Sequence, residues 1–284
     1  MPTLWGYSFG ISDIRVTLAD GSERDCLQKI YPIAQSIALG FAGSVCIGFN
    51  VVEVMKQWLC NDKSDCAWLP LETVELWPEL ARNIFASAPP GEQAGHCHLI
   101  MLSADPKARN GLGPVTYAHI FRSPDFKPVQ IATHKVAGIG SGSFIEEYKK
   151  SLDEISENHE RNFSLMKMEA GMPGGMGGIL GFELTNMIKR TNPSGISSHL
   201  HYCCVYLGKT VIKANDHVTI GAWTAMESGS GINQPEAQPP PHSSDKSEAI
   251  PRGTYFEMPK IVQSWNELKE MLQSTGAQAE GAVA

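Results

Sequence analysis

From Ile30 to Val52 the chain carries no charged side chain. A run of this length is sufficient to cross a bilayer, which takes about 20 apolar residues. Polar and helix-breaking residues interrupt the run, namely Pro32, Gln35, Asn50 and the glycines Gly40, Gly43 and Gly48. Two short buried strands, followed by a helix that Asn50 caps, account for this pattern better than a membrane span. We therefore expect the run to form part of the core of a folded domain, with no membrane partner.

The overall composition is typical of a globular protein that does not bind polyanions. Of the 284 residues, 42% are hydrophobic and 19% are charged, which is sufficient for one large domain or two modest ones. The net charge is −7 at pH 7. Binding to nucleic acid or to an anionic membrane needs a basic face, so we expect no nucleic-acid partner.

The cysteines do not show the pattern of a disulfide-stabilised secreted domain. They number 7, an odd count, and the adjacent Cys203 and Cys204 would point to opposite faces of a strand. Residues 1–6 contain no basic segment followed by an apolar run, as a signal peptide would. The sequence predicts a cytoplasmic protein with reduced thiols.

Strand and helix patterns alternate in blocks along residues 1–222. β-Branched and aromatic residues favour strands in the ranges 7–18, 96–102, 115–121, 129–133, 202–206 and 209–214. Apolar residues at helical spacing favour helices after Asn50, over 71–86, after Gly142, and in a segment that ends near Arg190. Helices therefore come in pairs between blocks of strands. This order fits two stacked sheets with a helix layer outside each better than one alternating sheet.

Residues 223–284 differ in composition from the rest of the chain. They are rich in Pro and Ser, include Pro239-Pro240-Pro241, and are typical of an acidic flexible tail. Within residues 259–273, apolar side chains recur at helical spacing at Ile261, Trp265, Leu268 and Leu272. This short helix either docks on the body or on a partner, or it remains a weakly helical part of the tail.

Three segments, Ser12–Thr17, Lys29–Ile33 and Ala38–Val45, resemble the proteasome β-subunits and their bacterial ring-peptidase relatives. Asp13 and Lys29 are 16 positions apart and Lys29 and Gly43 are 14 apart, which matches the spacing of the structural aspartate, catalytic lysine and substrate-binding glycine of that family. Two later motifs follow in the family's order, Gly140-Ser141-Gly142 and Arg190-Thr191-Asn192-Pro193-Ser194-Gly195.

The resemblance implies an α+β fold of the N-terminal-nucleophile hydrolase type, which is a four-layer αββα sandwich. It implies a threonine-type peptidase that needs no cofactor and acts in intracellular protein degradation. It also implies a homo-oligomeric ring, a peptide substrate and cooperation with an unfolding ATPase.

By the same resemblance, five residues take roles in peptide cleavage. In the family, the hydroxyl of an N-terminal threonine attacks the peptide carbonyl, and the α-amine of that threonine, with a pKa near ~8, takes the proton. Lys29 would lower the pKa of this amine, Asp13 would orient Lys29, and the Gly43 N–H would stabilise the oxyanion. Ser141 and Ser194 would hold the amine. From the residues alone, Asp13 and Lys29 also fit an ordinary ion pair between strands, and Gly43 a packing glycine.

The chain departs from the family pattern in two places. The nucleophilic threonine would lie about four positions before Met1, and the strand that carries it is missing as well. This leaves the strand that starts at Tyr7 with a bare edge unless another segment covers it. Thr191 stands where the family has aspartate. We therefore expect the chain as given to be inert as a threonine peptidase. Either an upstream start supplies strand and nucleophile, or the chain is a non-catalytic assembly or binding module.

Two other constellations indicate different chemistry. The segment Gly138–Gly142 follows an expected strand and precedes an expected helix, as a dinucleotide phosphate loop does, although its third glycine comes one position early. Two further groups share strand faces in a way that suits zinc, His96 with His98, and His199 with His201 and Cys203. Because nothing joins these groups into one site, we predict no metal and no cofactor, and keep nucleotide binding as a minor alternative.

Overall fold

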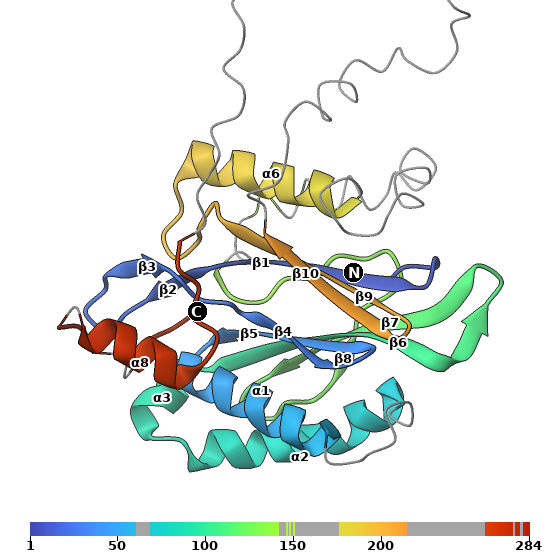
Figure 1. The fold of residues 1–284 in the computed structure, drawn as a ribbon, viewed down its shortest axis with the longest axis horizontal. Helices are drawn as coiled ribbons and strands as arrows, with labels where there is room; N and C mark the ends of the chain where they lie inside the picture. Colours follow the sequence, from blue (N-terminus) through green and yellow to red (C-terminus); the bar gives the residue numbers. More distant parts are fainter. Residues whose placement is uncertain are drawn as a thin grey trace, which may run out of the picture.

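A computed structural model describes residues 1–60, 69–141, 146, 148, 150, 176–214, 259–274, 276–278 and 281–284. In this part of the chain the protein is a mixed α+β fold with three antiparallel sheets and five helices (Figure 1). None of the helices in these ranges combines the length and the hydropathy that crossing a bilayer needs. The predicted helix after Gly142 falls almost entirely outside the described residues.

The larger sheet has five strands in the order β4-β5-β6-β7-β8. They are β4 (Ile30–Ala34), β5 (Ile37–Gly43), β6 (Cys97–Asn110), β7 (Gly113–Arg122) and β8 (Val129–Gln130). Helices α1 (Val45–Cys60) and α2 (Pro70–Ser87) lie against one face of this sheet, and the short α3 (Pro90–Ala94) leads back into β6 (Figure 1).

The uncharged run folds as β4, β5 and the first part of α1, so the prediction of two buried strands and a helix is confirmed. The helix begins at Val45, however, and the prediction that Asn50 caps it is wrong. Ser44 is the capping residue, because its Oγ accepts the N–H of Ile47 at 3.3 Å. Asn50 lies inside the helix and is exposed. Both residue types are good caps, and sequence periodicity alone does not decide between them.

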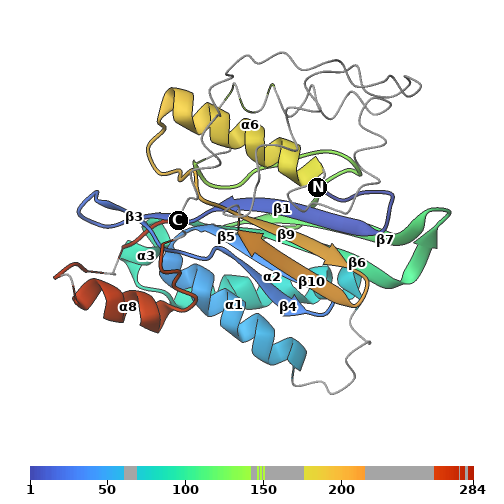
Figure 2. The ribbon, with the colours of Figure 1, turned by 45° about the horizontal axis from the view of Figure 1, so that its top comes forward.

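The second sheet has three strands in the order β1-β9-β10. They are β1 (Tyr7–Asp13), β9 (Leu200–Tyr206) and β10 (Lys209–Ala214). One of its faces meets the larger sheet, because Cys203 and Val205 share a core cluster with Ile30, Leu102 and Ile120. Helix α6 (Met176–Thr191) packs on the other face (Figure 2). Its Leu180 shares a core cluster with Phe9 and Cys204 of this sheet. Cys203 and Cys204 thus point to opposite faces, as predicted.

The predicted strand over residues 7–18 is interrupted at Ile14. After this break the chain forms β2 (Arg15–Thr17), which pairs with β3 (Glu23–Asp25) in a small separate sheet. The Asp13 carboxylate accepts the Arg15 N–H at 2.8 Å. Such a local side-chain bond competes with strand pairing, and it turns the chain out of the sheet at this point.

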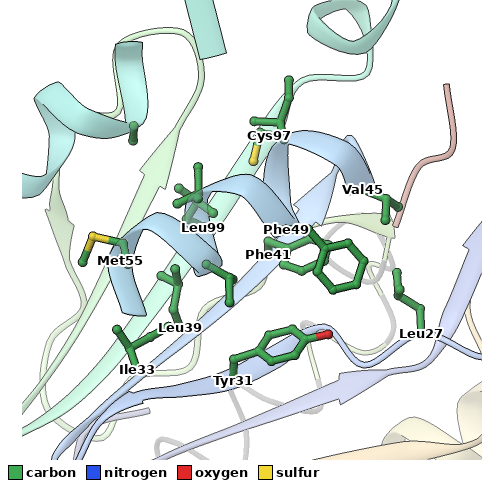
Figure 3. Packing of buried hydrophobic residues seen from close by; sticks show 14 of the residues in the cluster. Leu27, Tyr31, Ile33, Leu39, Phe41, Val45, Phe49, Met55, Cys97 and Leu99 are labelled. Carbon is green, nitrogen blue, oxygen red and sulfur yellow. The ribbon is translucent and has the colours of Figure 1, made fainter. Parts of the chain in front are cut away.

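The largest core cluster lies between α1 and the five-stranded sheet. Figure 3 shows its aromatic centre, which Tyr31, Phe41 and Phe49 form. The Phe41 ring lies parallel to Tyr31 with the ring centroids 6.3 Å apart, and it meets Phe49 edge-on with the centroids 5.4 Å apart. A Cβ at Gly48 would overlap the Phe41 ring. Glycine at this helix position therefore lets α1 approach the sheet closely, and the helix fixes the end of β5 where the candidate site begins.

The described end of the chain packs on this same core. Helix α8 (Trp265–Gln273) begins at Ser264, whose Oγ accepts the Glu267 N–H, and it buries Leu268 and Leu272 almost completely. Of the alternatives open for residues 259–273, the structure therefore has docking on the body. The remainder of the predicted tail lies largely outside the described residues, and the boundary at residue 222 remains a prediction.

Candidate functional site

Lys29 and Asp13 form an ion pair beside the end of β1. Asp13 is the last residue of β1, and Lys29 directly precedes β4. The Lys29 Nζ donates to both carboxylate oxygens of Asp13, at 3.0 and 3.1 Å. The Lys29 side chain is 5% exposed and that of Asp13 is 18% exposed. Since a buried ammonium needs a partner, Asp13 determines where the Lys29 charge is held.

Backbone N–H groups also fix the Asp13 carboxylate. Its Oδ1 accepts the Arg15 N–H at 2.8 Å and, more weakly, the Ser197 N–H at 3.4 Å. These contacts come from β2 and from the loop before β9. The carboxylate that orients Lys29 is therefore itself held from two directions.

A second group of charges adjoins this pair, because Arg15 and Ser197 belong to both. Arg15 donates to both carboxylate oxygens of Asp25, at 2.7 and 3.2 Å, and to Glu23 at 2.9 Å. Ser197 Oγ donates to Asp25 at 2.7 Å. Burial raises the pKa of Asp25, but the hydrogen bonds from Arg15 and Ser197 and the Arg15 charge outweigh it, so the pKa lies below its ordinary value. Ionised Asp25 thus ties the β2–β3 hairpin to the loop before β9.

Asp13 and Lys29 line a cavity of about 620 Å³, a volume in the range of small-ligand sites. His98 and Arg122, which are paired neighbours on β6 and β7, also line it. Burial, and then the charge of Arg122, lower the pKa of His98, so its ring is neutral at pH 7. Among the described lining residues, the charged side chains are thus two cations, Lys29 and Arg122, and one anion, Asp13.

Gly43 ends β5 in a conformation that requires glycine. Its φ is 97°, and a Cβ there would lie 2.7 Å from the carbonyl oxygen of His96 and 2.9 Å from that of Gly95. The Gly43 N–H donates to the main-chain oxygen of Ala284 at 2.7 Å, and the Ala284 N–H donates to the Gly43 oxygen at 2.8 Å. The Gly43 N–H, which the resemblance implies would stabilise the oxyanion, thus donates to the main-chain oxygen of Ala284 in this structure.

An extended segment, residues 281–284, runs between β2 and the start of α1. Thr17 and Val283 exchange two backbone hydrogen bonds, each of 2.9 Å, and the Val45 N–H donates to the Ala282 oxygen at 3.0 Å. Ala284 lines the cavity together with Lys29. Sequence reasoning did not single out this segment, because it is short and uncharged. The only local signal is Gly281, whose φ is 77° and which indicates a turn.

The two predicted serines lie near each other, but only Ser141 lines the cavity. It contacts Gly195, where a Cβ would lie 3.0 Å from the Ser141 Oγ. Ser194 is exposed, and its hydroxyl donates to Glu23 Oε1 at 2.9 Å, as does the Gly195 N–H at 2.7 Å. The Ser194 side chain is thus engaged by β3. Thr191, which replaces the family's aspartate, donates to the Met187 oxygen within α6 at 2.9 Å.

Residues 1–3 lie beside the first half of β1. The Phe9 N–H donates to the Met1 oxygen at 2.9 Å, the Thr3 N–H donates to the Tyr7 oxygen at 3.1 Å, and the Met1 amine donates to the Phe9 oxygen at 2.7 Å. The strand edge that was expected to need cover is therefore covered from Tyr7 to Phe9. Met1 also lines the cavity.

The glycine segment 138–142 and the His/Cys groups are the two motifs that indicated nucleotide or metal chemistry. The segment from Gly138 to Ser141 lines the cavity, and Gly142 lies outside the described residues. The strand expected before this segment is reduced to the two residues of β8. Within the described ranges, no group of three or more His, Cys, Asp or Glu side chains is arranged to hold a metal ion.

No protein-family model matches the chain, and none of the curated proteins is detectably similar to it in sequence.

Proposed function

We propose that the chain is a proteasome-like subunit of the N-terminal-nucleophile hydrolase type, and that its cavity is a site of peptide cleavage in intracellular protein degradation. One observation carries the proposal. The buried Lys29–Asp13 pair and a main-chain segment bonded to the Gly43 N–H border the same cavity. An activating cation, its orienting carboxylate and a donor directed at a carbonyl are what this chemistry needs.

A four-layer αββα sandwich is part of this proposal. The three-stranded and the five-stranded sheet share a core cluster. Helix α6 packs on the outer face of the three-stranded sheet, and α1 and α2 pack on the outer face of the five-stranded sheet. This packing order supports the family's architecture. We extend the proposal to a homo-oligomeric ring in the cytoplasm that receives unfolded chains from an ATPase, for which native mass spectrometry is the first test.

In the proposed reaction, the nucleophile and the base belong to a threonine that precedes Met1. The Lys29 ammonium repels a second cation, so a neighbouring α-amine would be neutral and basic at pH 7. This amine takes the proton of the attacking hydroxyl and returns it to the leaving amine, while the Gly43 N–H stabilises the oxyanion. Water then releases the acyl group from the threonine oxygen.

The test uses the chain extended by its in-frame upstream sequence, with fluorogenic peptides as substrates. We expect Lys29→Ala to abolish hydrolysis, and Lys209→Ala, a change at an exposed lysine on β10, to leave it unchanged. Hydrolysis that survives Lys29→Ala would overturn the mechanism. A stop codon directly upstream of Met1 would contradict the catalytic form.

A non-catalytic binding module is the second candidate. It is favoured by the observation that Thr17, Gly43 and Val45 hold an extended segment through backbone groups alone, which requires no nucleophile. Saturable peptide binding without turnover, in the extended chain as well, would decide for this candidate.

A further inference from the structure

Residues 281–284 occupy their groove in the manner of a peptide ligand. Val283 forms an antiparallel β-bridge with Thr17 of β2 on one side and with Ser44, just before α1, on the other. Five backbone hydrogen bonds of 2.7 to 3.0 Å hold Ala282, Val283 and Ala284. Their side chains are small, so most of the recognition comes from main-chain groups, as it does when an extended peptide adds to a sheet edge.

We propose that residues 281–284 regulate this site by occupying, in cis, the groove between Thr17 and Gly43–Val45, in the place that an extended peptide with small side chains would take. An exogenous peptide then binds only while this segment is displaced. The inference concerns regulation of the site described above and so rests on the proposed function, although peptide binding itself requires no cleavage.

The location of the segment supports this inference. Ala284 reaches the cavity that Lys29 and Asp13 line, so a peptide in the same groove would meet the proposed chemical groups at the position that Ala284 holds. The segment and a substrate would also compete for the same donor, the Gly43 N–H. Simultaneous occupation is therefore excluded by hydrogen bonding as well as by space.

The attachment of the segment explains how it is held in place. Gly281 has a φ of 77°, and its N–H donates to Oε1 of the buried Glu92 at 2.8 Å. Beyond this turn, Ala282 is fully buried, whereas Val283 and Ala284 are partly exposed. Release thus requires one turn to open and one small side chain to leave the core.

The experiment measures binding of the peptide Gly-Ala-Val-Ala, labelled with fluorescein at its amine, to the full chain by fluorescence anisotropy. In Val283→Pro the segment loses the N–H that donates to Thr17. We expect the probe to bind this variant about tenfold more tightly than wild type. The apparent affinity of the probe rises with the fraction of molecules in which residues 281–284 have left the groove. Gln278→Pro, the same replacement at an exposed position three residues before the segment, is the matched control and should bind as wild type does.

A second pair of variants tests the same inference with a milder change than proline, in case Val283→Pro does not fold. Gly281→Ala strains the turn without a clash, since a Cβ would meet only Ala19 at 3.5 Å. Gly276→Ala adds similar strain at a φ of 74°, with nothing within 4 Å of the new Cβ. We expect tighter probe binding in Gly281→Ala and no change in Gly276→Ala.

Hydrolysis of fluorogenic peptides by the same variants, made in the chain extended by its in-frame upstream sequence, separates the two proposals. Tighter binding in Val283→Pro and Gly281→Ala without hydrolysis supports occupancy in cis and counts against the peptidase. Hydrolysis that is equal in wild type and both variants, with unchanged probe affinity, supports the peptidase and overturns occupancy in cis. Failure of the probe to bind any folded variant also overturns it.

Discussion

Glu92 binds Gly281 across 189 positions of sequence, through a hydrogen bond of 2.8 Å from the Gly281 N–H to Oε1. Its other carboxylate oxygen accepts the hydroxyl of Ser44, the residue that caps α1. Glu92 is 6% exposed. One buried carboxylate in the short helix α3 therefore connects the start of α1 to the segment that occupies the groove.

We expect Glu92→Ala to lower the free energy of unfolding by about 2–3 kcal/mol, because it leaves the buried Ser44 hydroxyl and the partly buried Gly281 N–H without their acceptor. Glu92→Gln keeps one carbonyl oxygen, and its amide can still donate to the Ser44 hydroxyl oxygen, so its cost should be smaller by about 1 kcal/mol or more. Urea denaturation checks both values. Equal costs for the two variants would show that the hydrogen bonds of Glu92 are not what stabilises this junction.

Those parts of the fold that depend on local pattern were predictable from the sequence. The uncharged run from Ile30 to Val52 became two strands and a helix, because continuous apolar character with interspersed glycines is typical of strands buried on both faces. The opposite orientations of Cys203 and Cys204 follow from the period of a strand. The contact between Asp13 and Lys29, which the family resemblance implied, is present in the structure.

The contacts that depend on tertiary structure were not predictable in this way. Ser44 and Asn50 are equally good caps in isolation, and the choice is determined by where Gly43 leaves the sheet. Residues 281–284 carry no periodicity and no charge, and their placement depends on backbone groups that every residue has. The direction of the Ser194 hydroxyl is determined by Glu23, a partner 171 positions away.

Gly43 should tolerate no side chain. In Gly43→Ala, the new Cβ would lie within 3 Å of two carbonyl oxygens, in addition to the cost of a φ of 97°. We expect a loss of about 3 kcal/mol in the free energy of unfolding. Gly21→Ala is the matched control, because φ is 80° there and nothing lies within 4 Å of the Cβ, so only the backbone cost of about 1 kcal/mol applies. Similar losses for both variants, measured by urea denaturation, would contradict the close packing at Gly43.

Lys29 should be coupled energetically to Asp13. Lys29→Met leaves the Asp13 carboxylate, 18% exposed, without its cation, and we expect a loss of about 2–3 kcal/mol of stability because the unpaired charge remains partly buried. The double variant Lys29→Met with Asp13→Asn removes both charges and should recover about 1 kcal/mol or more of that loss. A double-mutant cycle from urea denaturation measures the coupling. If the two single losses simply add, the pair contributes no interaction to the fold.

The network around Asp25 should make stability depend on pH below about 5. The pKa of Asp25 in the folded chain is lower than its unfolded value, which lies near ~4. For such a group, the stabilisation is complete above the unfolded pKa and is lost as the pH falls through the folded pKa, because the unfolded chain binds the proton more readily.

Asp25→Asn removes this titration, so its free energy of unfolding should fall less steeply than that of wild type between pH 5 and 3, by up to about 1.4 kcal/mol per pH unit. Ser197→Ala keeps the carboxylate but deletes its 2.7 Å hydrogen bond, so the pKa of Asp25 in the folded chain should rise toward the unfolded value, and the acid loss of stability should become smaller and end at a higher pH. Urea denaturation at a series of pH values measures both effects. Parallel curves for wild type and Asp25→Asn would mean that Arg15 and Ser197 do not hold Asp25 in its ionised form.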